Sequence, residues 1–333
     1  MTTSDGVNKM PAHESARRRA ASFISNIVIT AVGLSAAIGL VTPALAAEKC
    51  KPLQRITTID MTYNDNGAVI PATIANRSVH LVLDTGAFLS VMSEPLADEL
   101  GLLKDRAMDM TIRDAANRSI RFFVKLPFFQ VGGLKTNQAI FFLTDGFSAK
   151  GTEEDPAGVF GGDFLRNFDL DLDFAAAKLG LYAHNYCKEG QVVHWSDDHY
   201  GVVDLRAVKS SRTQITAEVI LDGQKMRALI DTGAGYSSMT LATAKKRFKL
   251  DPNSPGVGAG GSATAMTGTK MDAYGYVFNS LTVGDVQFQN APFALLRTSD
   301  SSEHDIILGM NELKKMHIYL AYAQNKMYVT PAE

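Results

Sequence analysis

The stretch L-V-L-D-T-G-A-F at residues 81–88 ends an apolar run on an aspartate, followed by threonine, glycine and alanine. A carboxylate at the end of a buried strand is costly unless a partner satisfies it. A single D-T-G is an ordinary turn tripeptide and would be weak evidence for any function. The question that this stretch poses is what pairs with Asp84.

A second copy of the stretch, A-L-I-D-T-G-A, occupies residues 228–234. The agreement continues beyond the tripeptide, because G-V-F-G-G-D-F-L at 158–165 aligns with I-I-L-G-M-N-E-L at 306–313. These two segments follow Asp84 and Asp231 at nearly equal distances. The chain therefore contains a duplicated domain rather than a chance repeat of three residues.

The two copies share a pattern of strands, turns and one helix. Alternating apolar runs lead into each D-T-G, and Asp222-Gly223 is a hairpin signal between two such runs. A short amphipathic helix is expected after each D-T-G. The first covers about 94–100 behind the cap Ser93, and the second starts near Leu241.

This pattern predicts a mainly β protein with two tandem homologous lobes, each resembling a β-barrel. We place the N-terminal lobe at residues 47–185 and the C-terminal lobe at 214–333. Residues 186–213, which hold the single Trp, are expected to form a linker between them.

Residues 1–46 have the features of a targeting segment. A basic flank with Arg17, Arg18 and Arg19 precedes a stretch without charge, which ends in T-P-A-L-A-A with alanines at 44 and 46. We interpret this as a secretory signal peptide cleaved before Ala47, with an uncleaved membrane anchor as the alternative. The expected location is the periplasm or the exterior, or the inner membrane if the anchor is retained. Association with a membrane is expected only in that last case.

Composition narrows the classes of function. The chain has 333 residues, of which 46% are apolar and 20% charged, a globular composition. Its formal net charge is −2, with no long basic block outside the N-terminus, which argues against nucleic acid as a partner.

The paired D-T-G turns have a chemical interpretation. Two homologous lobes related by a pseudo-twofold axis bring equivalent residues together near that axis, so Asp84 and Asp231 are expected to meet. Two carboxylates in contact share one proton, and the pair can act as general base on water and general acid on a carbonyl oxygen. We expect Gly86 and Gly233 to allow close backbone approach and two threonines, Thr85 and Thr232, to cross-link the turns.

With these motifs, L-V-L-D-T-G-A with G-V-F-G-G and A-L-I-D-T-G-A with I-I-L-G-M, the chain resembles the aspartic protease superfamily. D-T-G-A in a compact lobe is closer to retropepsin-like domains than to pepsin. The resemblance implies a bilobal acid protease fold, a peptide or protein substrate held between the lobes, and catalysis by Asp84 and Asp231 through an activated water. It also implies that Gly161 and Gly309 brace the catalytic turns.

The family covers its site with a hairpin flap, and the chain departs from this pattern in the first lobe. The second lobe offers the glycine-rich run 256–266, in which Gly258, Gly260 and Gly261 would let backbone lie against a peptide; a plain loop is the alternative. The first lobe has R-D-A-A-N-R-S at 113–119, without glycine or the tyrosine of pepsin. A reduced first flap is therefore expected.

The chain has two cysteines, Cys50 and Cys187. Because export favours oxidation, we expect a disulfide between them, with two unpaired thiols as the alternative.

Neither a metal nor a cofactor is expected. The spaced aspartates of F-D-L-D-L-D-F at 168–174 resemble a calcium loop, but alternating leucines indicate a strand. His184, Cys187, His194 and His199 lie close in sequence, yet their spacing fits no tight zinc site.

These observations predict an exported aspartic endopeptidase that is a monomer with an internal pseudo-dimer. The first alternative is a non-catalytic envelope protein with the same fold that binds peptides or a protein partner. In the second, each lobe pairs with its counterpart in another chain.

Overall fold

The computed structural model describes residues 51–64, 67–107, 112–113, 119–187, 191–196, 199–258, 260–264, 270–301 and 303–332. The chain divides into Met1–Glu48 and a compact unit, Lys49–Glu333. The predicted signal segment lies outside the described residues. Within the described part, no helix is both long and apolar enough to cross a bilayer.

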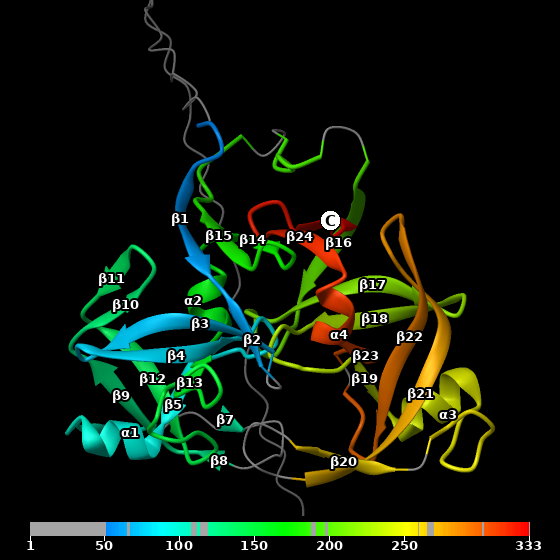
Figure 1. Ribbon diagram of the computed structural model, residues 1–333, viewed down its shortest axis with the longest axis horizontal. Helices are drawn as coiled ribbons and strands as arrows, with labels where there is room; N and C mark the ends of the chain where they lie inside the picture. Colours follow the sequence, from blue (N-terminus) through cyan, green and yellow to red (C-terminus); the bar gives the residue numbers. More distant parts are fainter. Residues whose placement is uncertain are drawn as a thin grey trace, which may run out of the picture. The chain divides into compact units, whose positions relative to one another are not determined.

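The first lobe is built almost entirely from short strands (Figure 1). Its elements are β1 (Arg55–Asp60), β2 (Thr62–Asn64), β3 (Gly67–Ile74), β4 (Arg77–Leu83), β5 (Val91–Ser93), α1 (Glu94–Glu99), β6 (Lys104–Arg106), β7 (Ile112–Arg113), β8 (Ser119–Ile120), β9 (Phe122–Leu126), β10 (Phe129–Val131), β11 (Leu134–Thr136), β12 (Ala139–Thr144), β13 (Gly158–Phe160), α2 (Gly162–Leu165), β14 (Asp169–Asp173) and β15 (Lys178–Tyr182).

The second lobe repeats this order. It comprises β16 (Gly201–Ala207), β17 (Ile215–Leu221), β18 (Gln224–Ile230), β19 (Ser238–Thr240), α3 (Leu241–Phe248), β20 (Gly261–Thr264), β21 (Lys270–Val283), β22 (Val286–Leu296), β23 (Ile306–Leu308), α4 (Met310–Leu313), β24 (Met316–Ala321) and β25 (Lys326–Pro331). The predicted mainly β, two-lobed fold is confirmed.

Turn and cap residues form the local structure that the sequence indicates. Asp222 and Gly223 both have positive φ, 43° and 76°, and close the β17–β18 hairpin as a primed turn does. Helix α1 begins after Ser93, whose side chain accepts from the backbone N–H of Leu96. Helix α3 begins in the same way after Thr240.

The lobes differ in the hairpins that follow their helices. In the second lobe, β21 and β22 pair in one register from Ala273 with Leu296 to Val283 with Val286. In the first lobe the equivalent strands are broken, and Pro127 separates β9 from β10. Proline has a fixed φ and no N–H to donate, so Pro127 removes one ladder donor at the place where the strands break.

A shared sheet joins the lobes. Its strand order is β1-β15-β14-β24-β25-β16-β17-β18-β23-β19-β22-β21-β20, and β14 of the first lobe pairs antiparallel with β24 of the second. The first lobe's own sheet runs β11-β10-β3-β4-β13-β5-β12-β9-β6, with β2 on β3.

The segment 186–213, predicted as a linker, contains a strand. Residues Gly201–Ala207 form β16, which pairs with both β25 and β17. Alternate side chains of β16, among them Val203 and Leu205, are buried. This period-two pattern is that of a strand with one face in the core, which explains why the segment joins the sheet.

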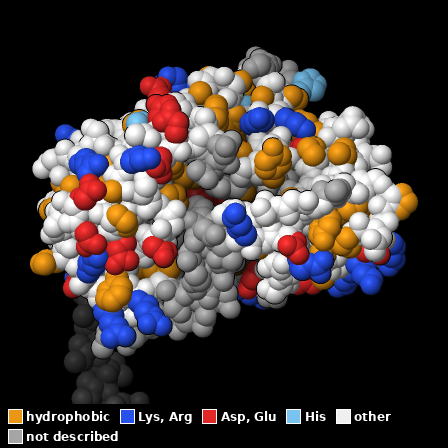
Figure 2. All heavy atoms as spheres, turned by 60° about the horizontal axis from the view of Figure 1, so that its bottom comes forward, with side chains coloured by type: hydrophobic (Ala, Val, Ile, Leu, Met, Phe, Trp, Pro, Cys, Tyr) orange, Lys and Arg blue, Asp and Glu red, His pale blue; other side chains and the backbone are white. Residues whose placement is uncertain are grey.

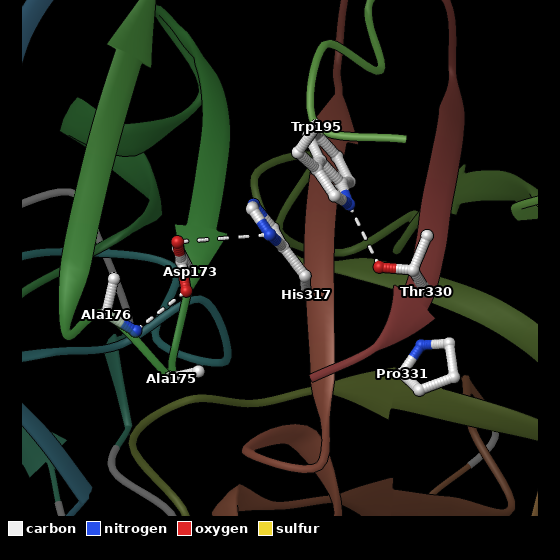
Figure 3. Close-up of a pocket in the computed structure, with 7 residues that line it drawn as sticks. All are labelled: Asp173, Ala175, Ala176, Trp195, His317, Thr330 and Pro331. Carbon is white, nitrogen blue, oxygen red and sulfur yellow. Dashed lines mark hydrogen bonds and ion pairs between the residues drawn. The ribbon is translucent and has the colours of Figure 1, made fainter. Parts of the chain in front are cut away.

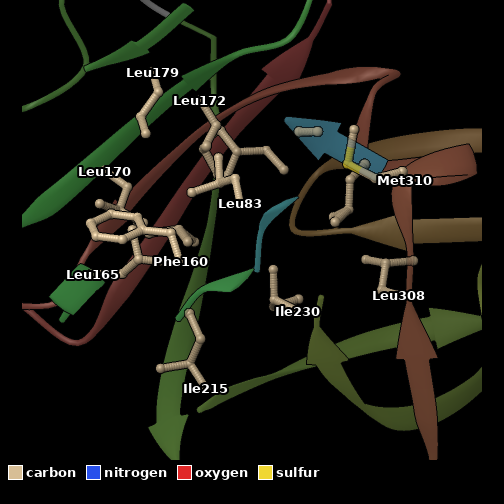
Figure 4. Packing of buried hydrophobic residues seen from close by; sticks show 14 of the residues in the cluster. Leu83, Phe160, Leu165, Leu170, Leu172, Leu179, Ile215, Ile230, Leu308 and Met310 are labelled. Carbon is tan, nitrogen blue, oxygen red and sulfur yellow. The ribbon is translucent and has the colours of Figure 1, made fainter. Parts of the chain in front are cut away.

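One hydrophobic cluster extends through both lobes. Leu83 and Ile230, the last strand residues before the two aspartates, are fully buried in it. Figure 4 shows them near Phe160, Leu308 and Met310. Phe160 belongs to β13, Leu308 to β23 and Met310 to α4. The ends of β4 and β18 are therefore held by a common core.

The described surface is mixed in charge. On the face shown in Figure 2, acidic and basic side chains are interspersed, and hydrophobic side chains occur singly or in small groups. This pattern is ordinary for a globular protein.

Candidate active site

Asp84 and Asp231 occupy equivalent places at the ends of β4 and β18. Each strand has a parallel neighbour, β13 for β4 and β23 for β18. The backbone N–H of Asp84 donates to Phe160 O and that of Asp231 donates to Leu308 O, both at 3.1 Å. Parallel pairing on one side thus fixes where each strand stops and its turn begins.

The two carboxyl groups lie close enough that each shifts the pKa of the other. A methyl group added at Gly86 would overlap the carboxyl group of Asp231, and one added at Gly233 would overlap that of Asp84. Each turn therefore lies directly against the aspartate of the opposite lobe. Asp84 is only 2% exposed, whereas Asp231 is half-buried, so the pair keeps some access to solvent.

The threonines of the two turns exchange hydrogen bonds. The N–H of Thr85 donates to Oγ1 of Thr232 at 3.1 Å, and the N–H of Thr232 donates to Oγ1 of Thr85 at 3.2 Å. Each hydroxyl donates to a carbonyl of the opposite lobe, Thr85 to Ile230 O at 2.7 Å and Thr232 to Leu83 O at 2.6 Å. The cross-link expected from the sequence is thus present in the structure.

Backbone donors from each turn also hold its own carboxylate. The N–H of Ala87 donates to Oδ1 of Asp84 at 2.7 Å, and that of Gly233 donates to Oδ1 of Asp231 at 3.0 Å. Such donors favour the ionised form of a carboxylate, whereas burial and a neighbouring negative charge oppose it.

Burial dominates at both positions. It raises the pKa of Asp84 above its usual range, although the hydrogen bonds from Asp231, Ala87 and Gly86 act in the opposite direction. Burial, followed by the negative charge of Asp84, raises the pKa of Asp231 well above its usual range. The pair is therefore arranged to keep a proton at a pH where separate aspartates would have lost it.

Gly161 and Gly309 lie directly beneath the two turns. The N–H of Gly161 donates to Oγ of Ser90 at 2.9 Å, and that of Gly309 donates to Oγ of Ser237 at 3.0 Å. A side chain at either glycine would overlap backbone of the turn that follows the aspartate. Sequence reasoning did not select the serines, although each stands at the same offset from its aspartate in the repeat.

Gln214 is a second residue that sequence reasoning missed. Its amide Nε2 donates to Gly86 O, across the lobe boundary. Its repeat equivalent at the start of β3 is Gly67, which has no side chain, so aligning the two copies gave no signal for this contact.

The glycines of the predicted second flap lie on the stem of a hairpin. Gly261 begins β20, which pairs with the start of β21. The N–H of Gly258 donates to Gly275 O at 2.8 Å, and Gly260 lies beside Ala273 and Tyr274. Residues 265–269, which connect the two strands, are outside the described residues, so contact with a peptide stays a prediction.

The first lobe also has a hairpin at the expected place. Strands β7 and β8 pair through Ile112–Ile120 and Arg113–Ser119, and residues 114–118 between them lie outside the described part. The prediction of a reduced first flap is therefore not tested at its tip.

Cys187 is disulfide-bonded. Its predicted partner, Cys50, lies outside the described residues, but the adjacent Lys51 forms an isolated bridge with Tyr186, and the N–H of Cys187 donates to Lys51 O at 3.1 Å. The segments next to the two cysteines therefore run side by side.

The spaced aspartates of 168–174 form strand β14, as the alternating leucines predicted. Leu170 and Leu172 are buried in the core, and the aspartates point to the other face. Asp171 bridges two histidines, with Oδ1 2.6 Å from Nε2 of His317 and Oδ2 3.3 Å from Nε2 of His194. No group of three or more metal-ligating side chains occurs in the described part of the chain.

A pocket of about 370 Å³ adjoins this cluster (Figure 3). Trp195 stacks on His317 with ring centroids 3.8 Å apart, and its indole N–H donates to Thr330 Oγ1 at 2.9 Å. None of the residues that line the pocket belongs to the D-T-G turns. Of the histidines near Cys187, His194 thus contacts the junction of the lobes through Asp171.

Two equivalent β lobes that bring one D-T-G aspartate each into contact define a two-lobed aspartic protease fold. Each lobe separately matches a family of aspartyl proteases. Residues 70–164 match the family described as aspartyl protease, and residues 217–315 match the family described as gag-polyprotein putative aspartyl protease. The chain belongs to the retropepsin-like aspartic protease superfamily, which indicates a proteolytic function and peptide substrates. No sequence among the curated proteins matches it significantly.

Proposed function

We propose that the chain is an exported aspartic endopeptidase that hydrolyses peptide bonds with a water activated between Asp84 and Asp231. The observation that supports this most directly is the contact between the two carboxyl groups where the lobes meet. Membership in the aspartic protease superfamily supports it independently.

The proposed reaction starts with one proton on the pair. The ionised carboxylate takes a proton from water as the water oxygen attacks the peptide carbonyl carbon, and the other carboxyl group gives its proton to the carbonyl oxygen. In the second step the gem-diol returns a proton to the pair while the amide nitrogen receives one and the C–N bond breaks. The pair ends with one proton, as it began.

In this mechanism the threonine cross-link and the bracing glycines position the two carboxyl groups. General acid–base catalysis depends on placing the acid and the base within hydrogen-bond reach of the reacting atoms. Since each threonine is bonded to the other turn and to the opposite strand, the two turns that carry the carboxyl groups are held together. The proposed reaction uses no group beyond these residues and water.

One chain contains both aspartates and the contacts between their turns, so the proposal needs no second chain to complete the site, and a monomer is expected. Measurement of molecular mass at the concentration used for assays tests this, and a mass of two chains would favour pairing between separate molecules.

Export is proposed from residues 1–46. Cell fractionation with mass determination of the purified N-terminus tests it, and an intact cytoplasmic chain would overturn it.

The test of the activity uses Asp84→Asn and Asp231→Asn in the purified protein, with a peptide library analysed by mass spectrometry. Each variant should lose at least about 100-fold in cleavage rate, the lower bound for removing a general acid or base. The matched control is Asp204→Asn, because Asp204 is an exposed aspartate paired with Lys326 on the surface. It should cleave as the wild type does.

Cleavage by the wild type that is inhibited by pepstatin and absent from both variants would support the proposal. Cleavage at the wild-type rate by either variant would overturn it. Peptide binding without turnover at any pH between 3 and 8 would also overturn it, and would favour the non-catalytic, peptide-binding alternative.

A further inference from the structure

A partly buried carboxylate that the proposed mechanism does not use lies under the first catalytic turn. Asp163 is the second residue of helix α2, which follows Gly161. Its Oδ1 accepts a hydrogen bond from the hydroxyl of Ser90 at 2.7 Å. Figure 4 shows Phe160 and Leu165, on either side of this turn, packed in the core.

Asp163 is connected to Asp84 through a short series of hydrogen bonds. Ser90, which is fully buried, donates to Asp163 and accepts from the N–H of Gly161. The next N–H, that of Gly162, donates to Ala87 O at 2.8 Å, and the N–H of Ala87 donates to Asp84. The carboxylate of Asp163 therefore anchors the hydroxyl that holds the base of this turn.

The second lobe builds the same structure with a neutral side chain. Ser237 accepts from Gly309, and the N–H of Met310 donates to Ala234 O at 2.7 Å. The place of Asp163 is taken by Asn311, whose Oδ1 accepts from the N–H of Ser237 at 2.6 Å and whose Nδ2 donates to Pro292 O at 2.9 Å. An amide does not titrate, so the side chain that replaces Asp163 carries no charge at any pH; its Nδ2 also donates to the carboxylate of Glu312 at 3.3 Å.

We propose that Asp163 is a positioning residue for Asp84. Because Asp163 can ionise and Asn311 cannot, the first catalytic turn should respond to pH differently from the second. The proposal rests on the proposed aspartic protease function. It assigns no contact with substrate to Asp163.

The surroundings of Asp163 make its charge sensitive to pH. Burial raises the pKa of Asp163, and the hydrogen bonds from Ser90 and nearby backbone only partly oppose this. Asp163 is therefore expected to gain its charge above the pH at which an exposed aspartate does.

The charge of Asp163 should act on the catalytic pair. A nearby negative charge makes loss of a further proton harder, so ionised Asp163 raises the apparent pKa values of the pair. Removing this charge should move both limbs of the pH profile of kcat/KM to lower pH. We expect a shift of about half a pH unit, the size of a single charge acting through several residues of protein.

The experiment compares Asp163→Asn with its reciprocal, Asn311→Asp, in the full chain. Asp163→Asn keeps an oxygen that can accept from Ser90 and removes only the charge, so its profile should shift to lower pH. Asn311→Asp adds a charge under the second turn and should shift the profile to higher pH. A purely structural role for Asp163 would lower the rate without moving either limb.

Asp155→Asn is the matched control, because Asp155 also accepts from a serine hydroxyl, Ser148 at 2.6 Å, but has no contact with either catalytic turn. Its profile should superimpose on that of the wild type. An Asp163→Asn profile that superimposes on the wild type would overturn the proposal. A shift of the reciprocal variant in the same direction as Asp163→Asn would also overturn it. If Asn311→Asp fails to fold, the Asp163→Asn profile decides alone.

A second measurement requires no turnover and so separates this proposal from the proposed function. The free energy of unfolding is measured from pH 4 to pH 8 for the wild type and Asp163→Asn. Because the folded-state pKa of Asp163 is raised, its ionisation costs stability as pH rises, and Asp163→Asn should gain stability over the wild type across this range. A constant difference would overturn the assignment of Asp163, whereas a wild type that cleaves nothing would overturn only the protease function.

Discussion

Thr85 and Thr232 hold each other through a reciprocal pair of hydrogen bonds, each backbone N–H donating to the hydroxyl of the other residue, at 3.1 and 3.2 Å. Both residues are fully buried. Because each hydroxyl also donates to a carbonyl of the opposite strand, one side chain satisfies two backbone groups across the lobe boundary. The cross-link therefore couples the stability of the lobes to the geometry of the two aspartates.

Replacing Thr85 with valine should destabilise the protein and abolish cleavage. The variant keeps the shape but leaves the N–H of Thr232 and the carbonyl of Ile230 without partners, each at a cost of about 1–3 kcal/mol. Thr85→Ser is the control, because it keeps the hydroxyl and removes one methyl group, which is worth about 1 kcal/mol. Denaturant unfolding measures both. Equal stability of the two variants would show that the hydroxyl does not hold the lobes.

Gly86→Ala should lose at least about 100-fold in cleavage rate while the fold persists. The added methyl group overlaps the carboxyl group of Asp231, so the pair must separate, and misplacing a reacting group by about 1 Å can cost this much. Gly275→Ala is the matched control, since an added methyl group there meets no atom within 4 Å. A Gly86→Ala protein as active as this control would contradict the close contact between the lobes.

The duplication explains why so much of the site could be predicted. Two copies of D-T-G with an apolar-apolar-glycine segment at matching distance allow equivalent residues to be aligned, and a pseudo-twofold axis then brings Asp84 and Asp231 together. The same comparison identified the places of α1 and α3 and the cap Ser93, because cap and turn residues act over three or four positions of the chain.

Sequence reasoning missed features that depend on distant contacts and are not repeated in both lobes. Gln214 reaches Gly86 through a contact far apart in the sequence, and Gly67 at its equivalent position gives no hint of it. The strand β16 was taken for linker because it lies in a segment rich in polar residues between the two copies of the repeat. Pairing with both β17 and β25 is a tertiary effect that overrides weak local preference.

The catalytic pair should make the protein less stable as pH rises. The pKa of Asp231 is raised well above its usual range in the folded state, so between its unfolded and folded pKa values the unfolded chain loses a proton that the folded chain keeps. Stability is therefore highest on the acid side of this window and falls through it.

Asp231→Asn removes this penalty and should unfold at higher denaturant concentration than the wild type at pH 7. The difference should shrink as pH falls toward the pKa of a free aspartate, about 3.9. Chemical unfolding at four or five pH values measures it. A variant that is less stable than the wild type at pH 7 would show that the charge on Asp231 is well compensated in the folded state.

The contact of Asp171 with His317 and His194 should stabilise the junction of the lobes most strongly at mildly acidic pH. Burial raises the pKa of Asp171, but the hydrogen bonds from the two histidines outweigh it and lower the pKa below its usual range. The hydrogen bond to Asp171 raises the pKa of His194. The stabilisation from Asp171 is lost as pH falls through its folded pKa, and that from His194 is lost as pH rises through its own. The contribution is therefore greatest between about pH 4 and 6.5.

Asp171→Asn should lower the free energy of unfolding by about 1.5–3 kcal/mol near pH 5.5, the range for hydrogen bonds to charged groups, and by less at pH 8.5. Asp60→Asn is the control, because Asp60 pairs with Lys178 on the surface, where an ion pair contributes at most about 1 kcal/mol. Because β14 and β24 carry Asp171 and His317 into the sheet that joins the lobes, loss at this contact should also broaden the unfolding transition. An equal loss for Asp171→Asn at both pH values would mean that the aspartate acts by shape and neutral hydrogen bonding, without dependence on the charge of the histidines.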